Sequence, residues 1–140
     1  MQTLDPNKVT HIVIHCTDTP EFRRVSVAEV DRWHRSRGWH GIGYHFLIGI
    51  DGEVWEGRPL HRRGAHVSGH NAHTIGVAYV GGRRAGQPAD TRTPMQKLAL
   101  RGLIDRLRQQ FPTVRHVVGH RDLNPGKSCP CYDVGTDAEK

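Results

Sequence analysis

The chain has 140 residues, of which 36% are hydrophobic and 24% charged, and its formal net charge is +6. This length suits one compact domain, and the apolar content excludes an intrinsically disordered chain. No apolar run approaches the ~20 residues that a membrane-spanning helix needs. The first residues also lack the basic start and apolar stretch of a secretory signal. We therefore expect a single domain over residues 1–140, made in the cytoplasm and without a membrane span.

The positive charge favours polyanionic partners such as nucleic acid, acidic lipid or acidic cell-wall polymer. The basic residues are spread along the chain, and their tightest cluster is Arg62-Arg63. A groove for nucleic acid usually interleaves basic with aromatic residues, and the sequence has no such stretch. We therefore expect no nucleic-acid partner.

The first predicted elements are a strand and a helix. Residues 9–16 (VTHIVIHC) form a β-branched run, which is typical of a strand buried on both faces. A polar loop over residues 17–24 follows. Ser26 then begins a helix, because Glu29 three positions later completes a capping box. Gly38 is expected to end this helix.

A β-hairpin and a further strand come next. Residues 44–50 and 53–57 flank Asp51-Gly52, a pair that favours a tight hairpin turn. Residues 59–74, rich in glycine and histidine, predict a long loop. The alternating pattern of residues 74–80 predicts another strand.

The second helix is the clearest element of the sequence. Thr93 can cap it, Pro94 suits its first turn, and Gln96 completes a second capping box. Pro112 ends it. One apolar face is formed by Leu100, Leu103, Ile104, Leu107 and Phe111.

The last predicted strand, residues 114–118, runs into Gly119-His120, and residues 81–92 and 121–140 are expected to be loops. Strands and helices alternate only loosely, and one hairpin is antiparallel. These features predict a mixed α/β (α+β) fold with a central mixed β-sheet flanked by helices.

Histidine and cysteine suggest the chemistry. The chain has 11 histidines and only three cysteines, which argues against a disulfide scaffold. His15 and His120 fall at the ends of the first and last predicted strands, and Cys129 lies in a loop that can return to that edge. Two imidazoles and a thiolate make a zinc site whose fourth position is open to water. Spacing alone leaves open the alternative that these three residues are unrelated.

Several motifs occur together and in a fixed order between residues 9 and 134. They are IVIHC (12–16), WHGIGYHF (39–46), GAH (64–66), Gly69 to Asn71, TIGVAYVGG (74–82), GHRD (119–122) and KSCPCYD (127–133). In combination they resemble the phage-type zinc N-acetylmuramoyl-L-alanine amidases (amidase type 2) and, more distantly, animal peptidoglycan recognition proteins. The resemblance implies the amidase and recognition-protein fold and a peptidoglycan substrate.

The resemblance also implies roles for individual residues. It places the ligands of Zn²⁺ at His15, His120 and Cys129. It makes Tyr44 and Lys127 the catalytic residues, and it places His66 and Asn71 along the substrate groove. Residues 135–140, by contrast, form a polar tail where phage relatives usually continue into a further helix.

Simpler roles remain open for several of these positions. Tyr44 can be a packing residue of its strand, and Lys127 can be a solvated surface charge. Cys131 is a rival metal ligand to Cys129. Cys16 is expected to face the side of the strand opposite to His15, as a small core residue. Asp122 is either a partner of a ligand or an ordinary surface carboxylate.

The favoured function is a monomeric phage or prophage endolysin that cuts peptidoglycan after another protein has opened the inner membrane. A cytoplasmic amidase that recycles wall fragments would use the same chemistry. A module that recognises peptidoglycan without cutting it is the alternative of another class, and the presence of Cys129 argues against it.

Overall fold

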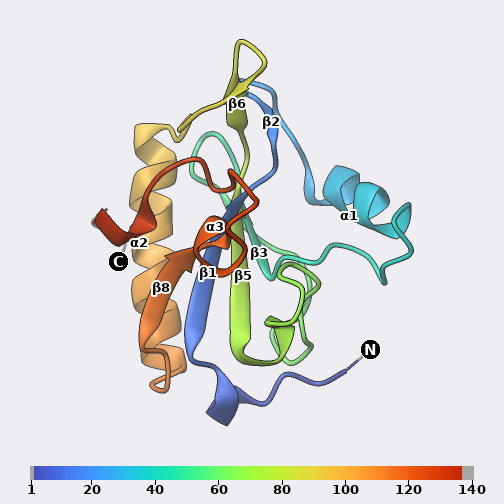
Figure 1. Cartoon of the computed structure of the whole chain (residues 1–140), viewed down its shortest axis with the longest axis vertical. Helices are drawn as coiled ribbons and strands as arrows, with labels where there is room; N and C mark the ends of the chain where they lie inside the picture. Colours follow the sequence, from blue (N-terminus) through green and yellow to red (C-terminus); the bar gives the residue numbers. More distant parts are fainter. Residues whose placement is uncertain (1, 137–140) are drawn as a thin grey trace.

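A mixed five-stranded sheet forms the centre of the computed structural model, which describes residues 2–136 (Figure 1). Its strands follow the order β4–β3–β5–β1–β8. They are β1 (His11–Cys16), β3 (Phe46–Ile48), β4 (Val54–Glu56), β5 (Thr74–Tyr79) and β8 (His116–Gly119). β1 runs parallel to β5 and β8, and β3 is parallel to β5 but antiparallel to β4.

Helices and short strands complete the described chain. The α-helices are α1 (Val27–Arg35), α2 (Pro94–Gln110) and α3 (His120–Leu123). Three 3-10 turns are η1 (Pro6–Lys8), η2 (Asn71–His73) and η3 (Val134–Thr136). A second small sheet contains β2 (Thr19–Pro20), β6 (Gly82–Arg84) and β7 (Gln87–Pro88).

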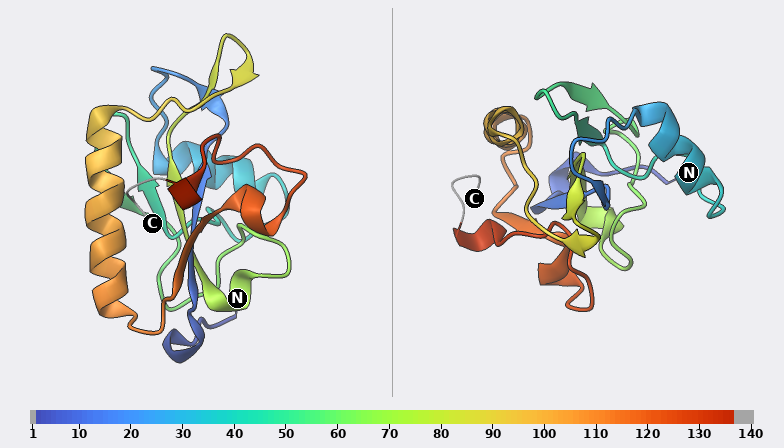
Figure 2. Two further views of the ribbon diagram at one scale, coloured as in Figure 1. Left: turned by 60° about the vertical axis from the view of Figure 1, so that its left-hand side comes forward. Right: turned by 90° about the horizontal axis from the view of Figure 1, so that it is seen from above.

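The two long helices lie on opposite sides of the main sheet (Figures 1 and 2). Ile12 and Ile14 of β1 pack with Leu100 and Ile104 of α2 in the larger core cluster. On the other face, the smaller cluster contains its own set of buried residues, Val25, Val30, Ile42, Leu47, Ala78 and Val80. Because strand side chains alternate between faces, Cys16 points away from His15 and joins the core cluster on the α2 side; it is a small core residue, as predicted.

Both predicted capping boxes are present. Ser26 accepts a hydrogen bond from the backbone N–H of Glu29, and Thr93 accepts one from that of Gln96. Gln96 is fully buried, and its side-chain amide donates to the carbonyl oxygens of Ile48 and Val80. This amide ties the start of α2 to two neighbouring strands of the sheet.

Parallel pairing brings the carboxyl ends of two distant strands to one edge. Ile14 of β1 pairs with Gly119 of β8, so His15 and His120 follow at the same level. On the other side, His15 pairs with Ala78 of β5. The sheet register therefore places two predicted ligands side by side, although 104 positions separate them in the sequence.

The predicted loops contain short regular elements: β2 lies within residues 17–24 and η2 within residues 59–74. Residues 82–88 form the β6–β7 hairpin, which pairs with β2 and protrudes beyond the main sheet (Figure 1). Residues 120–123 form α3 instead of loop. Both elements are very short and lack apolar periodicity, so their backbone hydrogen bonds left no pattern in the sequence. Of the predicted polar tail, residues 137–140 lie outside the described part of the chain.

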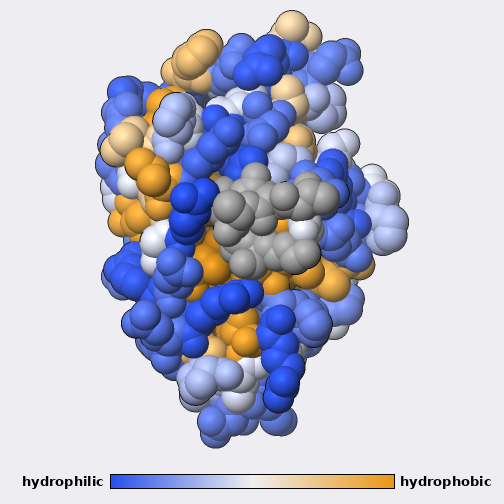
Figure 3. Space-filling view, turned by 90° about the vertical axis from the view of Figure 1, so that its left-hand side faces the viewer, coloured by the Kyte–Doolittle hydropathy of each residue, from blue (hydrophilic) through white to orange (hydrophobic). Residues whose placement is uncertain are grey.

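Helix α2 lies on a side of the molecule that is hydrophilic with hydrophobic patches (Figure 3), and Met95 and Leu98 are exposed on it. Its exposed residues include Lys97, Arg101, Arg106 and Arg108. Among residues 2–136, no helix is long and apolar enough to span a membrane.

Candidate active site

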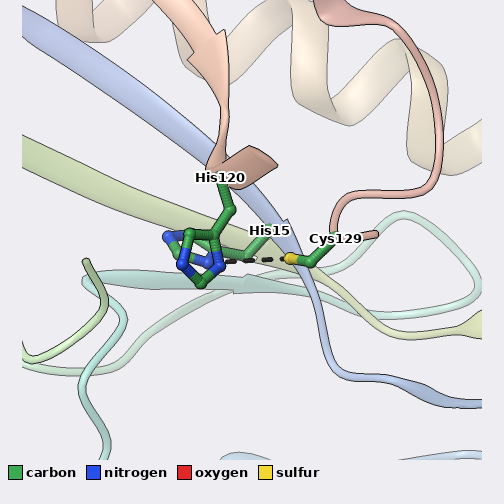
Figure 4. A group of neighbouring side chains, drawn as sticks. All are labelled: His15, His120 and Cys129. Carbon is green, nitrogen blue, oxygen red and sulfur yellow. Dashed lines mark hydrogen bonds between the residues drawn. The ribbon is translucent and has the colours of Figure 1, made fainter. Parts of the chain in front are cut away.

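Three predicted ligands converge at the carboxyl edge of the sheet (Figure 4). His15 comes from the end of β1, His120 begins α3 directly after β8, and Cys129 lies in the following loop. One ligand atom from each of the three lies within 4.8 Å of the others. The Cys129 sulfur is 3.8 Å from Nδ1 of His15, which identifies the ring nitrogen that faces the thiol.

Backbone hydrogen bonds fix the loop that bears Cys129. The backbone N–H of Cys16 donates to the Cys129 sulfur over 3.2 Å. The carbonyl oxygen of Cys129 accepts from the backbone N–H of Arg121 at 2.9 Å. Strand β1 thus contacts the thiol, and helix α3 holds the backbone of the same residue.

Asp122 acts on the backbone before His120. Its carboxylate accepts a hydrogen bond from the backbone N–H of Gly119 at 2.7 Å. This contact caps the first turn of α3 and fixes the point at which His120 leaves the strand. Asp122 therefore contacts the backbone that leads into His120.

Burial keeps the ligand histidines neutral. His15 is 1% exposed, and burial, reinforced by neighbouring His66 and His120, lowers its pKa well below the usual value. Burial also lowers the pKa of His120, with a further contribution from the positive charge of Lys127. Metal ions bind the neutral imidazole, so both rings are in the form that a ligand requires.

Tyr44 lies directly beside the ligand group. Its ring centroid is 5.0 Å from that of His15 and 5.2 Å from that of His34. Burial, together with the nearby Cys129 and Cys16 thiols, raises the pKa of Tyr44 above its ordinary value. Its hydroxyl therefore stays protonated at neutral pH and is suited to donate a hydrogen bond.

Two adjoining hollows open beside these residues, one of about 290 Å³ and the other of about 460 Å³. Tyr44, His120 and Lys127 line both hollows. Sites for small ligands usually measure roughly 300–1,000 Å³. The two hollows therefore form a groove of suitable size, and the predicted catalytic residues lie where they join.

The structure places His66 and Asn71 along the larger hollow. His66 is 8% exposed, and Oδ1 of Asn71 accepts hydrogen bonds from the backbone N–H groups of His66 and Val67. Asn71 thus braces the loop that forms this wall of the groove.

His34 was not predicted from the sequence as a residue of this region. Its Nδ1 accepts from the backbone N–H of Gly43 at 2.8 Å, and burial lowers its pKa to about 4. It therefore anchors the segment that leads into Tyr44. His34 follows the buried Val30 by four positions, a spacing that places both on the inner face of α1 and could have indicated its role.

The rival ligand Cys131 lies apart from the three-residue group. Its sulfur is 3.9 Å from that of Cys16. Within residues 2–136, the group of three potential ligands contains His15, His120 and Cys129 but not Cys131.

Comparisons with known proteins identify the family. The profile of the N-acetylmuramoyl-L-alanine amidase family (Amidase_2) matches residues 5–132. The endolysin of Klebsiella phage KP32 is 40% identical over 128 residues, covering 91% of this chain and 83% of the relative.

Solved structures give the same result. The amidase LysC from Clostridium intestinale superposes with a TM-score of 0.77 at 32% identity, covering 91% of this chain and 80% of the other. Bumblebee PGRP-SA has the same TM-score at 29% identity, covering 93% of this chain and 79% of the other. The predicted fold class is confirmed, and the chain belongs to the N-acetylmuramoyl-L-alanine amidase family.

Proposed function

We propose that this protein is a zinc-dependent amidase that cleaves the amide bond between N-acetylmuramic acid and L-alanine in peptidoglycan. The observation that supports it best is the group His15, His120 and Cys129 beside a groove that Tyr44 and Lys127 line. Membership of the amidase family and the similarity to phage endolysins support the same reaction.

The donor set fits zinc. Two neutral imidazoles and a thiol are the ligand types that zinc prefers, and three protein ligands leave a coordination position open for chemistry. The hydrogen bond from the backbone N–H of Cys16 holds the Cys129 sulfur beside the two imidazoles. When bound, zinc supplies a water of lowered pKa and polarises the substrate carbonyl.

The chain's own residues would orient the substrate and stabilise developing charge. The ammonium group of Lys127, which lines both hollows, would stabilise the negative charge on the amide oxygen as the tetrahedral intermediate forms. The protonated Tyr44 hydroxyl would donate a hydrogen bond to the same oxygen or hold the attacking water. His66 and Asn71 would form part of the groove wall along the substrate.

Digestion of purified peptidoglycan tests the proposal. We expect new L-alanine amino termini to appear, to vanish when a zinc chelator is added and to return when zinc is restored. Termini that form equally in the presence of chelator would contradict the metal assignment. Intact murein in a zinc-loaded sample that still binds it would instead favour a recognition module.

We further propose that the protein is a phage or prophage endolysin. The similarity to phage endolysins over most of both chains supports this role. We expect a monomer that reaches the wall after another protein opens the inner membrane. Rates on intact murein and on soluble anhydromuropeptides separate this role from recycling, because strong preference for the fragments would contradict lysis.

A further inference from the structure

A chain of hydrogen bonds leads from the predicted metal site into the interior. Nε2 of His15 lies 2.8 Å from Nδ1 of His66, and Nε2 of His66 lies 3.0 Å from the hydroxyl of Thr74. The Thr74 hydroxyl donates to the carbonyl oxygen of His70 at 2.8 Å. His15, His66 and Thr74 are all buried, so water cannot substitute for these partners.

The hydrogen bond from Thr74 to the carbonyl oxygen of His70 fixes the direction of the other two. A carbonyl oxygen only accepts, and a hydroxyl has a single proton to donate. Thr74 therefore gives its proton to His70 and must accept from Nε2–H of His66. His66 is buried between the rings of His15 and His45, an environment that excludes a second proton, so this ring carries only that proton.

The proton on His66 in turn fixes the hydrogen-bond role of the predicted ligand His15. With its proton on Nε2, His66 offers a lone pair at Nδ1, so His15 must donate from its own Nε2–H. The neutral His15 ring then has its lone pair on Nδ1. That is the nitrogen 3.8 Å from the Cys129 sulfur, on the side where the three ligand groups meet (Figure 4).

We propose that His66 and Thr74 are positioning residues that hold His15 in the Nε2–H tautomer and so present its Nδ1 lone pair to the metal. The inference deepens the proposed zinc-dependent function. In the opposite tautomer, His15 would direct an N–H group at the metal position and could not bind. Partners of this kind typically change metal affinity by ~10–100-fold.

Two glycines, Gly64 and Gly76, leave the space that the His66 ring occupies. A Cβ atom at Gly76 would lie 2.7 Å from Cγ of His66, and one at Gly64 would overlap its Cδ2. Side chains at these two positions are therefore excluded by the imidazole itself. The hydrogen bonds from the backbone N–H groups of His66 and Val67 to Asn71 hold the segment that bears the ring.

The first test compares Thr74→Val with Thr74→Ser. Valine keeps the shape but removes the acceptor for His66, whereas serine keeps the hydroxyl. We expect Thr74→Val to weaken zinc binding by roughly tenfold or more, measured by competition with a chelator of known affinity. Thr74→Ser should bind zinc like the wild type. Equal affinity in all three proteins would overturn the inference.

The second readout does not depend on zinc or on activity. Long-range ¹H–¹⁵N NMR spectra of the metal-free protein distinguish the two tautomers of each histidine. We expect the Nε2–H pattern for His15 and His66 in the wild type, and a shift toward the other tautomer in Thr74→Val. A wild-type His15 that carries its proton on Nδ1 would overturn the proposal even if the variants failed to fold.

These readouts separate the inference from the proposed function. A protein with the expected tautomers and the expected loss of zinc affinity, but no amidase activity, would contradict the proposed function and leave the positioning role standing. An active zinc amidase whose His15 tautomer is unchanged in Thr74→Val would contradict the positioning role and leave the proposed function standing.

Discussion

Histidines gather at both ends of the central sheet, but they are held differently. The cluster at the carboxyl ends of β1 and β8 contains His15, His120 and Cys129. One ligand atom from each of these residues lies within 4.8 Å of the others. At the amino ends of the same strands, the ring centroid of His11 lies 4.7 Å from that of His116 and 5.3 Å from that of His73. Within residues 2–136, only the first cluster brings three potential ligands together.

The difference shows what a metal site requires beyond histidine. His15 is buried, and hydrogen bonding directs its Nδ1 lone pair inward, toward a thiol. By contrast, His116 is exposed, and the hydroxyl of Thr10 contacts Nδ1 of both His11 and His73. The amino-end cluster has no thiol to join its imidazoles. The number of histidines in a cluster therefore predicts a metal site less well than their burial and hydrogen-bond partners do.

The largest effect is expected from removing the thiol that distinguishes the two ends. Cys129→Ala leaves two imidazoles, so we expect the bound zinc to be lost and amidase activity to fall to background. Metal analysis of the purified protein together with murein digestion checks this. Cys131→Ala is the matched control and should keep both zinc and activity. The reverse result would make Cys131 the true ligand.

A smaller effect is expected from Lys127→Ala, which leaves the ligand cluster unchanged. The variant should retain zinc but lose on the order of 100-fold in rate, because an electrostatic contact to the developing oxyanion disappears. Steady-state rates on soluble muropeptides measure it. Lys97→Ala, an exposed lysine of α2, controls for net charge. An unchanged rate in Lys127→Ala would identify that lysine as a surface charge.

Acid should weaken the fold through two further buried histidines. Burial lowers the pKa of both His34 and His45 from 6.5 to about 4. Below pH 6.5 these histidines become protonated in the unfolded chain, whereas in the folded protein they stay neutral until about pH 4. Their stabilisation is therefore full above pH 6.5 and is lost as the pH falls toward 4. Each should contribute a loss on the order of 2 kcal/mol at pH 5.

Urea unfolding of the metal-free protein at pH 7 and pH 5 measures this loss. The structure assigns His45 a clear role, since its Nδ1 accepts from the backbone N–H of Gly76 and its Nε2–H donates to the carbonyl of Arg62. His45→Gln should lower stability at pH 7 but show a shallower dependence on pH. An identical slope in both proteins would show that His45 does not titrate in this range.

The smallest effect is expected at the amino end of the sheet. The double substitution His11→Asn and His116→Asn should leave zinc content unchanged and activity within about twofold, as is usual for surface changes. Metal analysis and murein digestion again provide the measurement. A loss of zinc from this variant would remove the distinction between the two clusters.

Local signals in the sequence predicted the elements that carry the site. The β-branched run before His15 identified β1, and the capping residues Ser26 and Thr93 identified the starts of two helices, because caps and periodicity act within a few residues. The β6–β7 hairpin was missed, since its short strands have no apolar alternation and depend on pairing with β2.

The sequence by itself determined the residue types, the strand ends on which His15 and His120 lie, and the thiol in the loop that follows. Only the tertiary structure decided that these groups meet, through the parallel pairing of Ile14 with Gly119. It alone also decided that His66 and Thr74 contact each other behind His15. The physical reason is that hydrogen bonds between distant segments depend on sheet register and loop packing, which leave no regular spacing along the chain.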